Sequence, residues 1–131
     1  MKRSLVIMIG LLSAFQAHAG RYTCKTSTLK GLYVYHSTGV MDGNAFAESG
    51  NEVFDGKGNV TGSSVDSADS HGQLVGTYVI NPDCTGTISY TLPVPLEEDI
   101  HLGPKGDTFT YIDHHPNSGQ VVSGVETRQS K

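Results

Sequence analysis

Two glutamates near aromatic residues are the first side chains whose types and spacing suggest a chemical role. Glu52 stands at even spacing from Phe46 and Phe54, so an extended strand would place all three on one face. Glu48 shares this spacing. A carboxylate enclosed by aromatic rings has a raised pKa and can act as a general acid or orient a ligand. Glu52 is therefore the one candidate catalytic residue, and a β-bulge that turns it to solvent is the alternative.

A second group, Asp113-His114-His115, has the residue types of a metal site. Neighbours on a strand point to opposite faces, so His114 and His115 could chelate one ion only if the strand ends before Pro116. They are weak metal candidates, and a pair entering a turn with pH-dependent charge is the alternative. His71 and His101 could join them only through the fold. The sequence predicts no cofactor.

The stretch FDGKGNVTG (residues 54–62) resembles a calcium loop, a glycosylation sequon and a hairpin turn. As a calcium loop it fails, because Lys57 occupies a ligand position and Val60 replaces the glycine of the sharp turn. Asp55, Gly56 and Gly58 instead supply the backbone angles of a tight turn. We therefore expect a hairpin here.

The first residues have the features of a cleaved export signal. Lys2 and Arg3 precede an apolar run, Leu5 to Phe15, that is too short to span a bilayer, and Ala17-His18-Ala19 fits a cleavage site after Ala19. We expect residues 1–19 to be a Sec-type signal peptide and residues 20–131 to form one secreted or periplasmic domain. No membrane insertion is expected after cleavage.

Both cysteines, Cys24 and Cys84, lie in the exported part, and an oxidising compartment favours a disulfide between them. On the chain-entropy account, closing a loop of this length stabilises the fold by about 4 kcal/mol.

The net charge of the exported chain limits which classes of molecule it is expected to bind. Without the signal, the chain has seven basic residues and thirteen acidic ones, a net charge of −6 with neutral histidines. No basic patch remains, so nucleic acid is not expected as a partner. A small apolar or aromatic ligand and a host or envelope protein remain as possible partners.

The elements that would position these residues are short strands separated by turns. Alternating polar and apolar residues, abundant glycine and the absence of a 3.6-residue period indicate an all-β chain. The acidic run Glu97-Glu98-Asp99 is expected to be a solvated loop. The predicted strands are Leu29–Thr38, Ala45–Phe54, Asn59–Ser67, Gln73–Ile80, Gly86–Leu92, a weak strand near Asp99–Leu102, Asp107–Asp113 and Gln120–Gln129.

The strand pattern predicts which side chains share the interior. An eight-stranded barrel can be filled by its own side chains or can hold one small ligand. Tyrosine rings with hydroxyl handles suit an aromatic or apolar ligand, whereas an aromatic core is the alternative. The predicted lumen residues are Tyr33, Tyr35, Phe46, Glu52, Phe54, Tyr78, Tyr90, Phe109 and Tyr111.

About eight strands joined mostly by hairpins fit either a sandwich or an up-and-down barrel. An immunoglobulin-type sandwich needs a core tryptophan and a tyrosine two residues before the second cysteine. This chain has no tryptophan and has Pro82 at that position. We therefore predict an antiparallel up-and-down barrel, with a sandwich as the alternative.

Four stretches carry a resemblance to a known family: GLYVY (31–35), VFDGKGNVTGS (53–63), GTYVINPDCTGTIS (76–89) and VVSGVETRQ (121–129). Together they resemble small exported bacterial proteins whose fold is of the allene oxide cyclase and dirigent type of eight-stranded barrel. The resemblance implies a barrel whose relatives handle apolar substrates in the lumen. No catalytic residue of the plant proteins matches a position of this chain. A bacterial origin would also make the sequon Asn59-Val60-Thr61 a coincidence.

Three functions follow as expectations. The leading one is a non-enzymatic barrel that binds a small apolar or aromatic ligand or a partner protein. An alternative is a cyclase or isomerase in the lumen, with Glu52 and a tyrosine such as Tyr33 or Tyr78 as acid–base groups. The other is a structural surface protein with a filled core.

Overall fold

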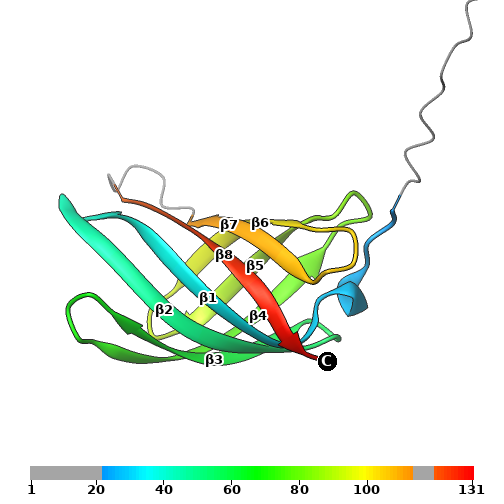
Figure 1. Ribbon diagram of the computed structural model, residues 1–131, viewed down its shortest axis with the longest axis horizontal. Coiled ribbons are helices and arrows are strands. Elements are labelled where there is room, and N and C mark those ends of the chain that lie inside the picture. Colours follow the sequence, from blue (N-terminus) through cyan, green and yellow to red (C-terminus); the bar gives the residue numbers. More distant parts are fainter. Residues whose placement is uncertain (1–21, 114–119) are drawn as a thin grey trace, which may run out of the picture.

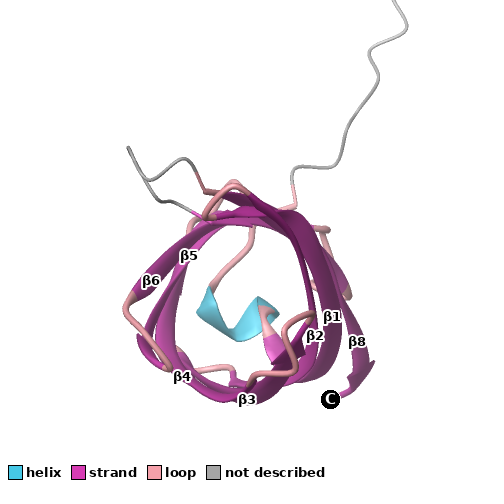
Figure 2. Ribbon diagram, turned by 90° about the vertical axis from the view of Figure 1, so that its left-hand side faces the viewer, coloured by secondary structure: helices cyan, strands magenta, loops and turns pink. Residues whose placement is uncertain are grey.

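Eight antiparallel strands close into one barrel in the computed structural model, which describes residues 22–113 and 120–131. Each strand pairs with the next along the chain, and the last pairs with the first, as the ring in Figure 2 shows. The predicted barrel is confirmed, and the sandwich alternative is wrong. The elements are η1 (Thr26–Thr28), β1 (Lys30–Met41), β2 (Asn44–Asp55), β3 (Asn59–Asp66), β4 (His71–Ile80), β5 (Thr85–Leu92), β6 (Leu96–Leu102), β7 (Thr108–Asp113) and β8 (Val121–Ser130). The expected signal peptide lies outside the described residues.

The sixth strand corrects one expectation from the sequence. The acidic run predicted to be a solvated loop lies inside β6, where Glu98 is buried and its neighbours Glu97 and Asp99 are exposed. The strand period of two explains this arrangement, because Glu98 shares the inward face with Ile100 and Leu102.

The stretch FDGKGNVTG forms the hairpin between β2 and β3. The Asp55 carboxylate accepts hydrogen bonds from the backbone N–H of Lys57 at 2.6 Å and of Asn59 at 3.0 Å. It also accepts one from the Asn59 side chain at 2.6 Å. These bonds lower the pKa of Asp55 to about 2. Phe54 and Val60 pair across the hairpin and are both buried, so this expectation is confirmed.

The N-terminal segment closes one end of the barrel, which we call the η1 end (Figures 1 and 2). Cys24 forms the predicted disulfide with Cys84 in the β4–β5 turn. Leu29 is fully buried, and its carbonyl accepts a hydrogen bond from the Tyr78 hydroxyl at 2.7 Å. η1 is three residues long, and the described part of the chain contains no helix long and apolar enough to cross a membrane.

Aromatic rings fill the half of the lumen next to η1. Phe54 lies at their centre, with its ring centroid 5.2 Å from Tyr33, 5.3 Å from Tyr78 and 5.8 Å from Phe109. The contacts are edge-to-face, the arrangement that aromatic quadrupoles favour. This half of the lumen is a packed core.

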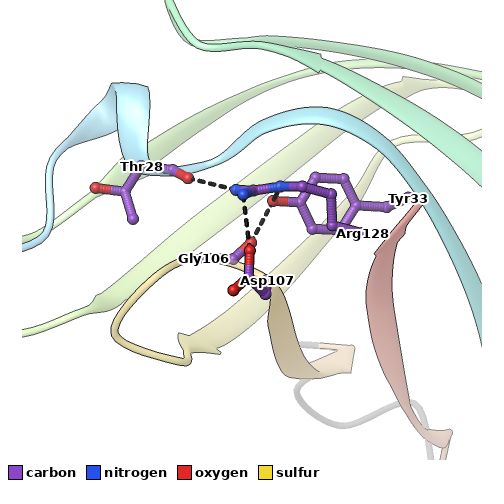
Figure 3. Close-up of polar contacts among 5 residues, drawn as sticks. All are labelled: Thr28, Tyr33, Gly106, Asp107 and Arg128. Atoms are coloured by element: carbon purple, nitrogen blue, oxygen red, sulfur yellow. Dashed lines mark hydrogen bonds and ion pairs between the residues drawn. The ribbon is translucent and has the colours of Figure 1, made fainter. Parts of the chain in front are cut away.

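Arg128 completes the closure of the η1 end (Figure 3). Its guanidinium donates to the Thr28 carbonyl, to the Tyr33 hydroxyl and to Asp107, at 2.9, 3.0 and 2.9 Å. The Tyr33 hydroxyl in turn donates to the carbonyl of Gly106. The Arg128 side chain is only 7% exposed. A fixed fork of donors therefore ties β8, β1, η1 and the β6–β7 turn together.

Candidate functional site

The other half of the lumen holds a cavity of about 210 Å³. It lies toward the end that carries the β1–β2, β3–β4 and β5–β6 connections, which we call the open end. The wall combines aromatic rings, aliphatic side chains and carboxyls from all eight strands or the connections next to them. The lining residues are Tyr35, Met41, Phe46, Glu48, Asp66, Leu74, Tyr90, Pro93, Val94, Leu96, Glu98, Tyr111, Asp113 and Glu126.

Two of the lining tyrosines lie against glycines of the barrel wall. A Cβ added to Gly50 would approach the Tyr35 ring to 2.6 Å, and one added to Gly124 would approach the Tyr111 ring to 2.5 Å. Each glycine faces its tyrosine across paired strands, Tyr35 with Gly50 and Tyr111 with Gly124. The missing side chains let the rings lie close to the wall, which leaves space in the middle of the lumen.

Three glutamates from three different strands meet at the inner end of the cavity. Glu52 of β2, Glu98 of β6 and Glu126 of β8 are 0%, 6% and 1% exposed. The Tyr90 hydroxyl donates to Glu52 Oε1 at 2.7 Å. Among the described residues, Oε2 of each glutamate has no hydrogen-bond donor. Glu98 and Glu126 line the cavity, whereas Glu52 lies behind it.

Burial favours the protonated form of these glutamates. It raises the pKa of Glu52 to about 7, although hydrogen bonds from Tyr90 and with Glu126 oppose the rise. Burial also raises the pKa of Glu98 and of Glu126 well above the usual range, and the charge of Glu52 adds to both. Glu52 and Glu126 interact directly, so the protonation of one affects the pKa of the other.

Three further carboxyls, those of Glu48, Asp66 and Asp113, line the cavity nearer the mouth. Burial raises the pKa of Asp113 to about 6, and the charge of Glu48 adds to the rise. Burial raises the pKa of Glu48 as well. Among the described residues no lysine or arginine lines the cavity, so these carboxyls have no basic counter-charge from this part of the chain.

The predicted lumen residues divide into two sets. Tyr35, Phe46, Tyr90 and Tyr111 line the cavity, whereas Tyr33, Phe54, Tyr78 and Phe109 form the packed half. Glu52 points inward and is fully buried, so the bulge that would have turned it to solvent is absent at this position.

The weak metal candidates His114 and His115 lie outside the described residues. His71 begins β4 at the open end, while His101 lies near the end of β6 toward η1, so the fold keeps these two apart. Within residues 22–113 and 120–131, no three His, Cys, Asp or Glu side chains are grouped so that they could hold a metal ion.

Sequence reasoning missed Glu98 and Glu126 as parts of the site. Glu126 stands at even spacing from Val122 and Gly124 and shares the inward face of β8 with them. Glu98 likewise shares the inward face of β6 with Ile100. The period of two was therefore present in both strands. Counting by twos through charged residues places both in the lumen, as it does Glu52.

No family model and no curated protein matches the chain. Solved structures that are similar to it include two β-barrels. One is a designed fluorescence-activating β-barrel, EF1p2_mFAP2b bound to the small aromatic ligand DFHBI, with a TM-score of 0.66 and 15% identity over 80% of this chain and 97% of that one. The other is a redesigned β-barrel, with a TM-score of 0.62 and 18% identity over 81% of this chain and 96% of that one. At these identities the similarity shows a shared fold: a closed, eight-stranded antiparallel barrel.

Proposed function

We propose that this protein is a binding barrel that holds a small aromatic or apolar molecule in the open half of its lumen. The observation that carries the proposal is the cavity of about 210 Å³ between the rings of Tyr35, Tyr90 and Tyr111. A cavity of ~150 Å³ is enough for benzene, so this one accommodates a single aromatic ring with a short substituent. A small concave site with apolar walls and a few polar groups is typical of ligand pockets.

Two observations favour binding over a purely structural role. Phe54 and the rings in contact with it fill the η1 half, where Arg128 and the disulfide also lie, whereas the cavity lies in the open half. In the open half, two glycines preserve space that ordinary side chains would fill. The similar barrel bound to DFHBI is an example of this fold with a small aromatic ligand. We infer the same class of ligand for this chain.

Export from the cytoplasm belongs to the same proposal. The signal-like residues 1–19 and the disulfide between Cys24 and Cys84 support a periplasmic or secreted barrel. The resemblance to barrels of the allene oxide cyclase and dirigent type supports a ligand inside the lumen.

Filling the cavity tests the proposal. Leu74 is buried and lines the cavity, while its neighbour Val75 on the same strand points outward. Leu74→Trp should abolish binding of small aromatic probes in thermal-shift and titration assays, and Val75→Trp should not. Native mass spectrometry of the protein from its own host would identify a co-purifying ligand. A clean mass together with no binding from a panel of aromatic probes would refute the proposal.

A lumen cyclase or isomerase is a second candidate because protonated carboxyls line the cavity. Glu98 and Glu126 reach the cavity wall, so either could donate a proton to a bound substrate. Glu52 does not line the cavity, and it would position Tyr90 and Glu126, with which it interacts. Conversion of a co-purifying molecule by the natural protein but not by Glu126→Gln would support this candidate. If the natural protein leaves that molecule chemically unchanged, this candidate is refuted.

A further inference from the structure

The three glutamates at the inner end of the cavity are not explained by an aromatic ligand alone. Glu98 Oε2 and Glu126 Oε2 are buried without a hydrogen-bond donor, and both residues line the cavity. An unsatisfied buried polar group destabilises the folded state, and more so when it is charged. A ligand that brings hydrogen-bond donors to these two oxygens would remove this destabilisation.

Charge is distributed unequally along the barrel axis. Every lysine and arginine of the described chain lies at the η1 end or in its turns: Lys25, Lys30, Lys57, Lys105, Arg128 and Lys131. The open end carries acidic residues in its turns and at its strand ends: Asp42, Glu48, Asp66, Asp69 and Asp113. A cleft lined by one sign of charge concentrates ligands of the opposite sign. The mouth of the cavity therefore attracts cations.

We propose that the ligand is a small organic cation, in which a protonated amine is joined by a short linker to one aromatic ring. This inference rests on the proposed function and specifies its ligand class. The ammonium group donates to Glu98 Oε2 and Glu126 Oε2, and the ring lies in the cavity beside Tyr35 and Tyr111, whose own rings are in contact with centroids 6.2 Å apart. Electron-rich tyrosine faces also favour a cationic neighbour.

The organic part distinguishes this ligand from a metal ion. The described carboxyls are not grouped to coordinate a metal, and aromatic and aliphatic side chains form much of the cavity wall. A bare ion would leave this apolar wall without a partner. An ammonium group has three donors, which suits the two carboxyl oxygens of the cavity wall that have no donor among the described residues.

Binding of such a cation releases protons from the site. An opposite charge favours the ionised form of a carboxyl, so Glu98 and Glu126 lose protons when the ammonium group arrives. Affinity then rises with pH by up to about tenfold per pH unit for each proton released, until the amine itself is deprotonated. Among the described residues, titratable groups of seven strands face the cavity or these carboxyls, while β4 contributes the apolar Leu74. They are Tyr35 on β1, Glu48 and Glu52 on β2, Asp66 on β3, Tyr90 on β5, Glu98 on β6, Tyr111 and Asp113 on β7 and Glu126 on β8.

Isothermal titration with three matched probes tests the inference: 2-phenylethylamine, 2-phenylethanol and 3-phenylpropionate. We expect the amine to bind at least tenfold more tightly than the alcohol at pH 8, and the carboxylate to bind weakest. The amine should bind more weakly at pH 5. Titrations in two buffers of different ionisation enthalpy should show net proton release.

Variants locate the effect in the cavity. Glu98→Gln and Glu126→Gln should each weaken the amine at least tenfold and leave the alcohol unchanged, while Glu97→Gln on the outer face of β6 should change neither. Binding of the alcohol as tight as that of the amine, or no loss in either lumen variant, would overturn the cation inference and leave the proposed function intact. Failure of all three probes with the natural protein would count against both. The three-probe comparison does not depend on whether the variants fold.

Discussion

Replacing Glu52 by glutamine should stabilise the barrel at neutral and alkaline pH. Glutamine has nearly the same shape, still accepts from the Tyr90 hydroxyl and can donate to Glu126. The folded barrel holds the Glu52 proton more tightly than the unfolded chain does, because burial raises the pKa from 4.5 to about 7. The stability associated with that proton is therefore fully present below pH 4.5 and is lost as the pH rises through about 7. At about 1.4 kcal/mol per pH unit, the loss is about 3 kcal/mol.

Urea unfolding between pH 4.5 and 8, with the disulfide intact, measures this difference. We expect Glu52→Gln and the natural protein to have equal free energies of unfolding near pH 4.5, and the variant to be more stable by about 3 kcal/mol at pH 8. With a urea slope near ~1.5 kcal/mol per molar, the midpoint would move by about 2 M. Glu97→Gln, which changes an exposed carboxyl of β6, should follow the natural protein. Parallel pH profiles for Glu52→Gln and the natural protein would refute the reasoning.

Three other changes test the structural supports of the site by urea unfolding. Cys24→Ser removes the disulfide with Cys84, which closes a loop across a separation of 60 residues, and should lower stability by about 4 kcal/mol; an unchanged midpoint would contradict this. Arg128→Ala removes three hydrogen bonds and the packing of a buried side chain, and should cost about 3 kcal/mol, with Arg128→Lys in between. Gly124→Ala places a Cβ 2.5 Å from both the Tyr111 ring and the His36 backbone carbonyl oxygen, and should cost about 1–3 kcal/mol; no change in stability or in ring environment by near-UV circular dichroism would show that a glycine is not needed there.

The barrel could be predicted because its determinants are local. Alternation with a period of two and turn residues at regular intervals recur along the chain, and the β2–β3 hairpin illustrates both. Asp55 and the glycines at φ 76° and 109° specify the turn, while Phe54 and Val60 specify the face. Such signals require no knowledge of distant contacts.

The site could be predicted only in part because its residues meet through closure of the barrel. Glu98 and Glu126 are 28 positions apart in the numbering, and each stands among residues that read as surface when taken alone. The run Glu97-Glu98-Asp99 illustrates the difficulty, because charged runs are usually solvated. The alternation places Glu98 inside the barrel. The sequence does not reveal that glutamates of β2, β6 and β8 come together near Tyr90.

The two halves of the lumen have opposite effects on stability, and this division suits a binding protein. The η1 half contains the aromatic core, the disulfide and Arg128, all of which favour the folded state. The open half buries three carboxyls beside an unfilled cavity, and both features oppose folding. A barrel without a ligand would be more stable with leucines in place of Glu98 and Glu126. Their presence is therefore better explained by a ligand that supplies the missing donors than by the needs of the fold.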